Sequence, residues 1–119
     1  MVQANTRVIP LQTHEQFEEM YTGGQPNGKP VLIYFTADWC GACKRVDWEF
    51  ILEEFPDLPV YKCDVDANKY TPGFCGVRSI PSFVMIKGAN EVIGPIQTSE
   101  TAKIASWIHQ NAIKAAKGK

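Results

Sequence analysis

Apolar residues recur along this chain with two spacings, one typical of strands and one typical of helices. Short runs rich in β-branched and aromatic residues predict strands over residues 7–11, 31–36, 60–65, 82–87 and 91–96. Apolar residues three and four positions apart predict helices between Thr13 and Gly23, over residues 44–55, over residues 68–74, and after a cap at Thr98 or Ser99. The run at 31–36 is apolar on both faces, which predicts a buried parallel strand.

Cap and turn residues support these boundaries. Thr13, with Gln16 three residues later, matches a capping box, and the pair predicts the start of the first helix. Gly23 predicts the end of that helix. Pro72 predicts a short, irregular helix around it, and the Gly-Ala-Asn sequence at 88–90 predicts a hairpin turn.

The predicted elements follow the order βαβαβαββα. Alternating strands and helices predict a parallel part of the sheet, and the closing hairpin adds an antiparallel edge. The expected fold class is therefore α/β, with a central mixed β-sheet flanked by helices. A length of 119 residues fits one compact domain. We expect this domain to span residues 1–119, with residues 1–5 and 115–119 frayed.

Composition and charge argue against several classes of partner. The chain is 45% hydrophobic and 21% charged, with a formal net charge of -1, so nothing favours nucleic acid or a membrane. No apolar run approaches the roughly 20 residues that cross a membrane. The N-terminus has no hydrophobic signal core. We expect a cytoplasmic protein that acts as a monomer.

The most informative stretch is Trp-Cys-Gly-Ala-Cys-Lys at residues 39–44. Cys40 and Cys43 can close into a disulfide and open again, and they lie between a predicted strand and a predicted helix. The alternatives are a structural disulfide or half of a structural zinc site, but such a zinc site needs four ligands and the chain has one CxxC pair. We therefore expect a redox-active dithiol and no bound metal.

The two cysteines have different expected roles. Cys40 lies at a helix N-terminus, where free N–H groups and the helix dipole favour an anion, so its pKa should fall below that of a free thiol. The thiolate is the attacking group in thiol–disulfide exchange. Cys43, one turn deeper, is expected to attack the mixed disulfide and release the reduced partner. Gly41 keeps the approach to Cys40 open, and Trp39 is expected on the docking surface.

The W-C-x-x-C-K segment resembles the hallmark of the thioredoxin family, with Lys44 as its last residue, and the element order extends the resemblance to nearly the whole chain. Ile80-Pro81 resembles a second family element. That resemblance implies that Pro81 is cis and lies against the cysteines, and that the backbone of Ile80 pairs with an extended substrate segment. Ala42 stands where most thioredoxins have proline, so the family's redox potential is not carried over.

Two positions depart from the family. Tyr34 stands where thioredoxins commonly have a buried aspartate that moves a proton to or from the second cysteine, and Trp48 stands where many have a helix-kinking proline. A tyrosine hydroxyl, with an ordinary pKa of about 10, is a poor base at neutral pH. Lys62 matches the lysine near that aspartate. We expect the Tyr34 ring beneath the active-site helix, with its hydroxyl directed to Lys62 or to an ordered water.

The remaining cysteines and acids have weaker expectations. Cys63, in a predicted strand, is expected to behave as a small buried hydrophobe. Cys75, in the loop before Ile80, is either a free thiol or a regulatory one. Asp64 and Asp66 are expected to form a solvated strand end.

The resemblance implies a thiol–disulfide oxidoreductase that reduces protein disulfides through Cys40 and Cys43, with no bound cofactor beyond that redox-active disulfide. It also implies disulfide-containing protein substrates and a thioredoxin reductase, or an equivalent dithiol donor, that supplies electrons from NADPH. Two alternatives remain at this point. One is an oxidase or isomerase of the same fold, and the other is a binding module with secondary redox chemistry.

Overall fold

The computed structural model describes residues 7–25 and 28–113, which fold around one five-stranded sheet. The strands are β1 (Val8–Pro10), β2 (Val31–Thr36), β3 (Val60–Asp64), β4 (Ser82–Gly88) and β5 (Glu91–Gln97). The helices are α2 (His14–Tyr21), the 3₁₀ helix η2 (Ala42–Arg45), α3 (Trp48–Glu54), α4 (Tyr70–Phe74), α5 (Thr101–Ile108) and the π-helical turn η3 (His109–Ile113). The ends predicted to fray, 1–5 and 115–119, lie outside the described residues.

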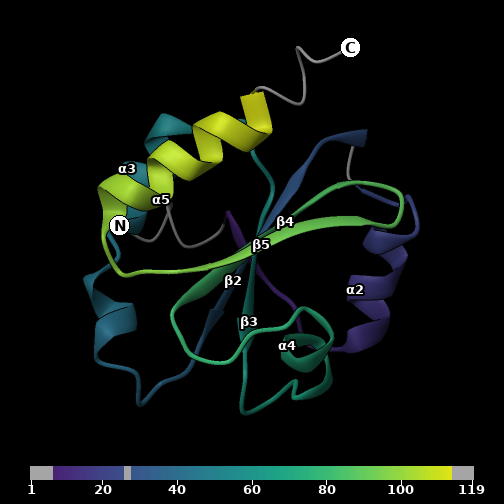
Figure 1. The fold of residues 1–119 in the computed structure, drawn as a ribbon, viewed down its shortest axis with the longest axis horizontal. Helices are drawn as coiled ribbons and strands as arrows, with labels where there is room; N and C mark the ends of the chain where they lie inside the picture. Colours follow the sequence, from purple (N-terminus) through teal and green to yellow (C-terminus); the bar gives the residue numbers. More distant parts are fainter. Residues whose placement is uncertain (1–6, 26–27, 114–119) are drawn as a thin grey trace.

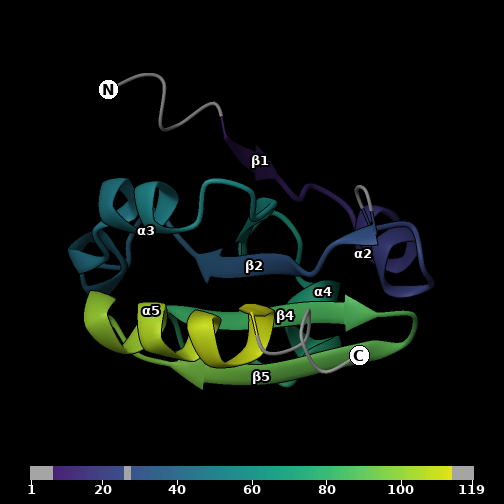
Figure 2. The ribbon, with the colours of Figure 1, turned by 90° about the horizontal axis from the view of Figure 1, so that it is seen from above.

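The sheet is mixed, which confirms the predicted fold class. Its strand order is β1-β3-β2-β4-β5, with β1 and β2 parallel to β3. β4 runs antiparallel to β2, and β5 runs antiparallel to β4. Figure 2 shows β1 at one edge of the molecule and the β4–β5 hairpin at the other. The central strand β2 is buried at every position, as the apolar run predicts.

Helices cover both faces of the sheet, and strand alternation sorts the core into two clusters. α3 and α5 lie on one face, and α2 and α4 lie on the other (Figure 1). Tyr34 and both CxxC cysteines belong to the cluster under α3 and α5, whereas Ile33, Phe35 and Cys63 belong to the other. Within the described residues, no helix is long and apolar enough to cross a membrane.

The helix caps agree with the sequence at one end of the chain and differ at the other. At α2, the Thr13 hydroxyl accepts the N–H of Gln16 and the Gln16 side chain accepts the N–H of Thr13, which confirms the capping box. The cap predicted for α5 is wrong, because its N-cap is Glu100. The Thr98 hydroxyl instead accepts the N–H of Glu100, so it stabilises the turn before the helix.

The helix predicted over 44–55 is interrupted, so the expectation of a continuous helix is wrong. η2 ends at Arg45, and Val46 has an extended backbone with ψ of 125°. Asp47 then caps α3, because its carboxylate accepts the N–H of Phe50 at 3.1 Å. A short acidic side chain is more favourable at a helix N-cap than in a helix interior, which explains the new start.

Two proline-containing elements keep their predicted place with adjusted bounds. α4 is shorter than the predicted 68–74, and Pro72 falls within its first turn, where its missing N–H costs nothing. Pro95 lies in β5, an edge strand, where a missing donor is tolerated. Gly94 has φ of +97°, and a Cβ there would lie 2.8 Å from the carbonyl oxygen of Phe83. No larger residue fits at Gly94 without moving β4.

Candidate active site

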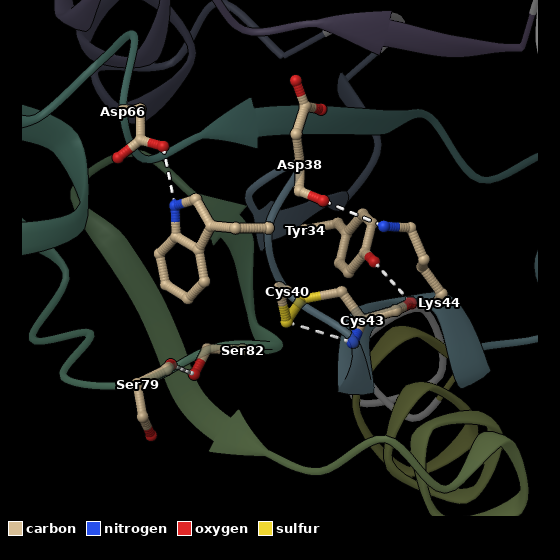
Figure 3. The surroundings of a disulfide bond; sticks show 9 residues. Tyr34, Asp38, Cys40, Cys43, Lys44, Asp66, Ser79 and Ser82 are labelled. Carbon is tan, nitrogen blue, oxygen red and sulfur yellow. Dashed lines mark hydrogen bonds between the residues drawn. A yellow bond between two sulfur atoms is a disulfide. The ribbon is translucent and has the colours of Figure 1, made fainter.

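A disulfide joins Cys40 and Cys43, whose Cα atoms lie 5.3 Å apart. Cys40 follows the loop that leaves the C-terminal end of β2, and Cys43 lies in η2. Both residues are buried. The backbone N–H of Cys43 donates to the Sγ atom of Cys40 at 3.1 Å (Figure 3). A donor aimed at sulfur favours the negatively charged form of that sulfur.

Tyr34 lies beneath this turn, as expected, but its hydroxyl has a different partner. The ring stacks on Phe83 with centroids 5.2 Å apart, and Trp48 lies tilted against it at 4.8 Å. The hydroxyl donates to the backbone carbonyl of Cys43 at 3.0 Å, and Figure 3 shows it directed toward the turn. The expectation that the hydroxyl is directed to Lys62 is therefore wrong. The interruption of the helix is the reason, because it leaves the Cys43 carbonyl in need of a donor.

Lys62 lies beside Tyr34 without reaching its hydroxyl. The two residues are paired in the β2–β3 register, and the Lys62 side chain is exposed. Together with Val8, Pro10 and Trp48 they line a pocket of about 330 Å³. The indole N–H of Trp48 is buried and has no partner among the described residues.

Trp39 is 68% exposed and is held in place by Asp66. Its indole N–H donates to the Asp66 carboxylate at 2.8 Å. Asp66, expected only as part of a solvated strand end, makes a contact that its local sequence does not reveal. The available signal was topological, because Asp66 follows β3 as Trp39 follows β2, and parallel neighbouring strands end at the same edge of a sheet.

Three other residues of the segment lie around the disulfide. The Lys44 ammonium donates to the carbonyl of Asp38 at 2.9 Å and so ties η2 to the loop before it. Ala42 is half-buried against the core cluster under α3 and α5. A Cβ added to Gly41 would meet nothing within 4 Å, so this side of the turn faces open space.

The Ile80–Pro81 bond is cis, as the resemblance implies. The Ser82 hydroxyl donates to the carbonyl of Ser79 at 2.5 Å and closes this turn. Pairing of β4 with its neighbours begins only at Ser82, so the sheet does not use the backbone of Ile80. Beside the turn lies a groove of about 390 Å³, lined by Trp39, Val65, Pro72, Val77, Arg78, Ser79 and Ile80.

The other two cysteines are free thiols in a different environment. Cys63 is fully buried, and burial together with the charge of Asp64 raises its pKa from 9.0 to about 12. Burial and the neighbouring Cys63 raise the pKa of Cys75 from 9.0 to about 12. Among residues 7–25 and 28–113, no group of three or more His, Cys, Asp or Glu residues is placed to hold a metal ion.

The Cys40–Cys43 disulfide thus lies where a short turn leaves the central strand, next to an exposed tryptophan and an apolar groove. Opening it takes up two electrons and closing it returns them. The fold and the site together define a thiol–disulfide oxidoreductase.

Comparison with known proteins identifies the family. The Thioredoxin family model matches residues 8–110. A thioredoxin H-type of Fagopyrum esculentum is 36% identical over 89 residues, which cover 72% of this chain and 76% of that protein. A thioredoxin of Geodia cydonium is 34% identical over 85 residues, with coverage of 70% and 80%. The oxidized form of mitochondrial thioredoxin 3 from Saccharomyces cerevisiae matches with a TM-score of 0.76 at 26% identity, covering 90% of this chain and 98% of that one. The chain belongs to the thioredoxin family.

Proposed function

We propose that this protein is a protein-disulfide reductase in which Cys40 is the nucleophile and Cys43 is the resolving cysteine. The observation that carries the proposal is the hydrogen bond from the backbone N–H of Cys43 to Sγ of Cys40. In the reduced protein this donor stabilises a thiolate on Cys40, and the thiolate is the form that attacks a disulfide.

The proposed cycle has two exchange steps. The Cys40 thiolate attacks one sulfur of a substrate disulfide, a Cys40–substrate bond forms, and the second substrate sulfur leaves as a thiolate. Cys43 then loses its proton to solvent and attacks Sγ of Cys40. The Cys40–Cys43 bond forms, and the remaining substrate sulfur leaves with the electron pair. The substrate gains two electrons, and the protein ends with the same disulfide that the structure contains.

We propose that substrates dock along the groove beside the disulfide. The backbone of Ile80 is not used by the sheet, so it can pair with an extended substrate segment as an added strand would. Trp39 forms one wall of the groove and offers a large apolar surface. Backbone pairing supplies affinity with little side-chain selectivity, which suits a reductase that acts on different protein disulfides.

The partners and location are further parts of this proposal. Family membership supports a thioredoxin reductase as the electron donor, with NADPH as the ultimate source, and disulfide-containing proteins as acceptors. The free thiols of Cys63 and Cys75 fit a reducing compartment such as the cytoplasm. We further propose that residues 1–119 act as one domain and as a monomer.

The deciding experiment monitors the reduction of insulin disulfides, with dithiothreitol as the electron donor. We expect turnover by the wild-type protein and none by Cys40→Ser. Pre-reduced Cys43→Ser, mixed with insulin after dithiothreitol has been removed, should form a trapped protein–insulin disulfide, detected by non-reducing electrophoresis. Full turnover by either single variant would contradict the two-cysteine mechanism.

The reduction potential separates reductase from oxidase. A value of about -270 mV would support the reductase, whereas a value of about -120 mV would indicate an oxidase with the same two cysteines. Equilibration with glutathione buffers of known ratio measures it.

A further inference from the structure

The interruption after Arg45 separates two backbone groups that a continuous helix would join. In an α-helix the carbonyl of each residue accepts the N–H of the residue four positions later. The carbonyl of Cys43 would therefore pair with the N–H of Asp47. The extended backbone of Val46 prevents that pairing and leaves Cys43 only a long backbone bond, 3.4 Å from the N–H of Val46.

Side chains from two other elements supply the missing partners. The hydroxyl of Tyr34, from β2, donates to the carbonyl of Cys43 at 3.0 Å. The N–H of Asp47 donates to the hydroxyl of Thr101, the first residue of α5, at 2.9 Å. One helical hydrogen bond has thus been replaced by two tertiary ones, and the one made by Tyr34 acts directly on a cysteine of the site.

We propose that Tyr34 is a positioning residue for the resolving step, in which its hydroxyl replaces a backbone N–H and fixes Cys43 over Cys40. The N–H of Cys43 is already directed at Sγ of Cys40. With its carbonyl held by Tyr34, the peptide groups on both sides of Cys43 have fixed orientations. Those two groups set the direction of the Cα–Cβ bond, and so set the line along which the Cys43 sulfur attacks.

The surroundings of Tyr34 suit this role. The ring is 5% exposed and is held between Phe83 and Trp48, so the hydroxyl has little freedom to leave the carbonyl. An ionised carboxylate at position 34 is an acceptor only and could not make the same bond. Tyr34 therefore serves Cys43 as a hydrogen-bond donor and not as a proton acceptor.

This inference rests on the proposed function, so its test separates the two exchange steps. The reduced protein, in excess, is mixed in a stopped-flow instrument with 5,5′-dithiobis(2-nitrobenzoate). Attack by Cys40 releases the first nitrobenzoate thiolate, and attack by Cys43 on Sγ of Cys40 releases the second. The first phase depends on protein concentration, whereas the second does not. Absence of the second phase in the wild-type protein would reject the two-cysteine mechanism itself.

Tyr34→Phe removes only the hydroxyl. We expect the second phase to slow about tenfold, the effect of losing one hydrogen bond to a buried carbonyl, while the first phase changes less than about twofold. The slowing should be the same from about pH 6 to about pH 9, because no proton acceptor has been removed. Tyr61→Phe is the matched control, since Tyr61 lies on the neighbouring β3 and packs against the other core cluster. It should change neither phase.

Three results would overturn the inference. An unchanged second phase would show that the hydroxyl does not matter to resolution. Equal slowing of both phases would show that Tyr34 acts only through general packing of the site. A slowing that disappears at high pH would show that the hydroxyl takes part in proton transfer.

Discussion

The protein contains two pairs of cysteines, and one sulfur atom of each pair makes a hydrogen bond, in opposite senses. Sγ of Cys40 accepts an N–H from Cys43 at 3.1 Å, whereas Sγ of Cys63 donates to the carbonyl of Asn68 at 3.8 Å. Accepting a hydrogen bond favours a thiolate, and donating one requires a protonated thiol. The same residue type is therefore prepared for reaction in one place and kept inert in the other.

The wider surroundings reinforce this difference. The CxxC pair lies beside a groove and an exposed tryptophan, where a partner can reach it. Cys63 and Cys75 lie against the other face of the sheet, and burial raises the pKa of each to about 12. Thiol reactivity here follows from local donors, charges and burial rather than from the number of cysteines.

Competitive alkylation should give the largest measurable difference between the two pairs of cysteines. With limiting iodoacetamide at pH 7, we expect Cys40 of the reduced protein to react first and Cys75 about a thousandfold more slowly, because a thiol with pKa of about 12 is almost never ionised at that pH. Mass spectrometry of peptides measures the order. Labelling of Cys75 at a rate near that of Cys40 would contradict the assignment of the nucleophile.

Alkaline unfolding tests the inert pair by itself. Below pH 9 both thiols keep their protons in the folded and unfolded chains, so their contribution to stability is complete. Between pH 9 and pH 12 the unfolded chain loses these protons and the folded protein keeps them. The free energy of unfolding should therefore fall with rising pH, by about 1.4 kcal/mol per pH unit for each thiol.

Urea titrations measure that slope. The control is the double variant Cys63→Ala, Cys75→Ala, because it removes these two thiols and keeps every other titratable group. An equal slope in the two proteins would show that these thiols ionise as easily in the folded state as in the unfolded one.

The element order could be predicted because β2 and β4 are long apolar runs and α2 carries a complete capping box. The interruption at Val46 and Asp47 could not. Apolar residues continue at helical spacing through it, and the partner of the Asp47 N–H is Thr101, 54 residues away. Asp47 offered a local cap signal, but only the tertiary contact decides between a cap and a helix interior.

The features of the site likewise divide into those that local sequence predicts and those that depend on contacts between elements. The spacing of Cys40 and Cys43, and the Ile80-Pro81 pair, could be recognised from local sequence. The partner of the Tyr34 hydroxyl could not, because it depends on a carbonyl left free by the unforeseen interruption. Contacts between elements, such as Trp39 with Asp66, need the strand register before they can be assigned.

Asp66→Ala tests how the surroundings of the CxxC pair contribute to its reaction with a protein disulfide. Without the carboxylate, the indole N–H of Trp39 loses its hydrogen bond to Asp66, which lies in the loop after β3. The ring then becomes free to move away from the groove. The second-order rate constant for reduction of a protein disulfide should fall about threefold, since an exposed hydrogen bond contributes roughly 0.5–1 kcal/mol. Alkylation of Cys40 by iodoacetamide should not change. Asp57→Ala, in the exposed loop after α3, is the control, and an equal loss there would remove the role given to Asp66.

Gly41→Ala has the smallest expected effect and separates access from packing. Gly41 has φ of -65° and ψ of -40°, which alanine adopts readily, and a Cβ there meets nothing within 4 Å. The free energy of unfolding should rise by about 0.5 kcal/mol, because alanine restricts the unfolded chain. The added methyl group extends into the space through which a partner reaches Cys40, so reduction of insulin should slow slightly while alkylation by iodoacetamide does not. Gly73→Ala, in α4 and equally open, is the matched control for stability. A slower reaction with iodoacetamide as well would mean that the methyl group disturbs the turn itself, and that the dithiol depends on Gly41 for its geometry rather than for access.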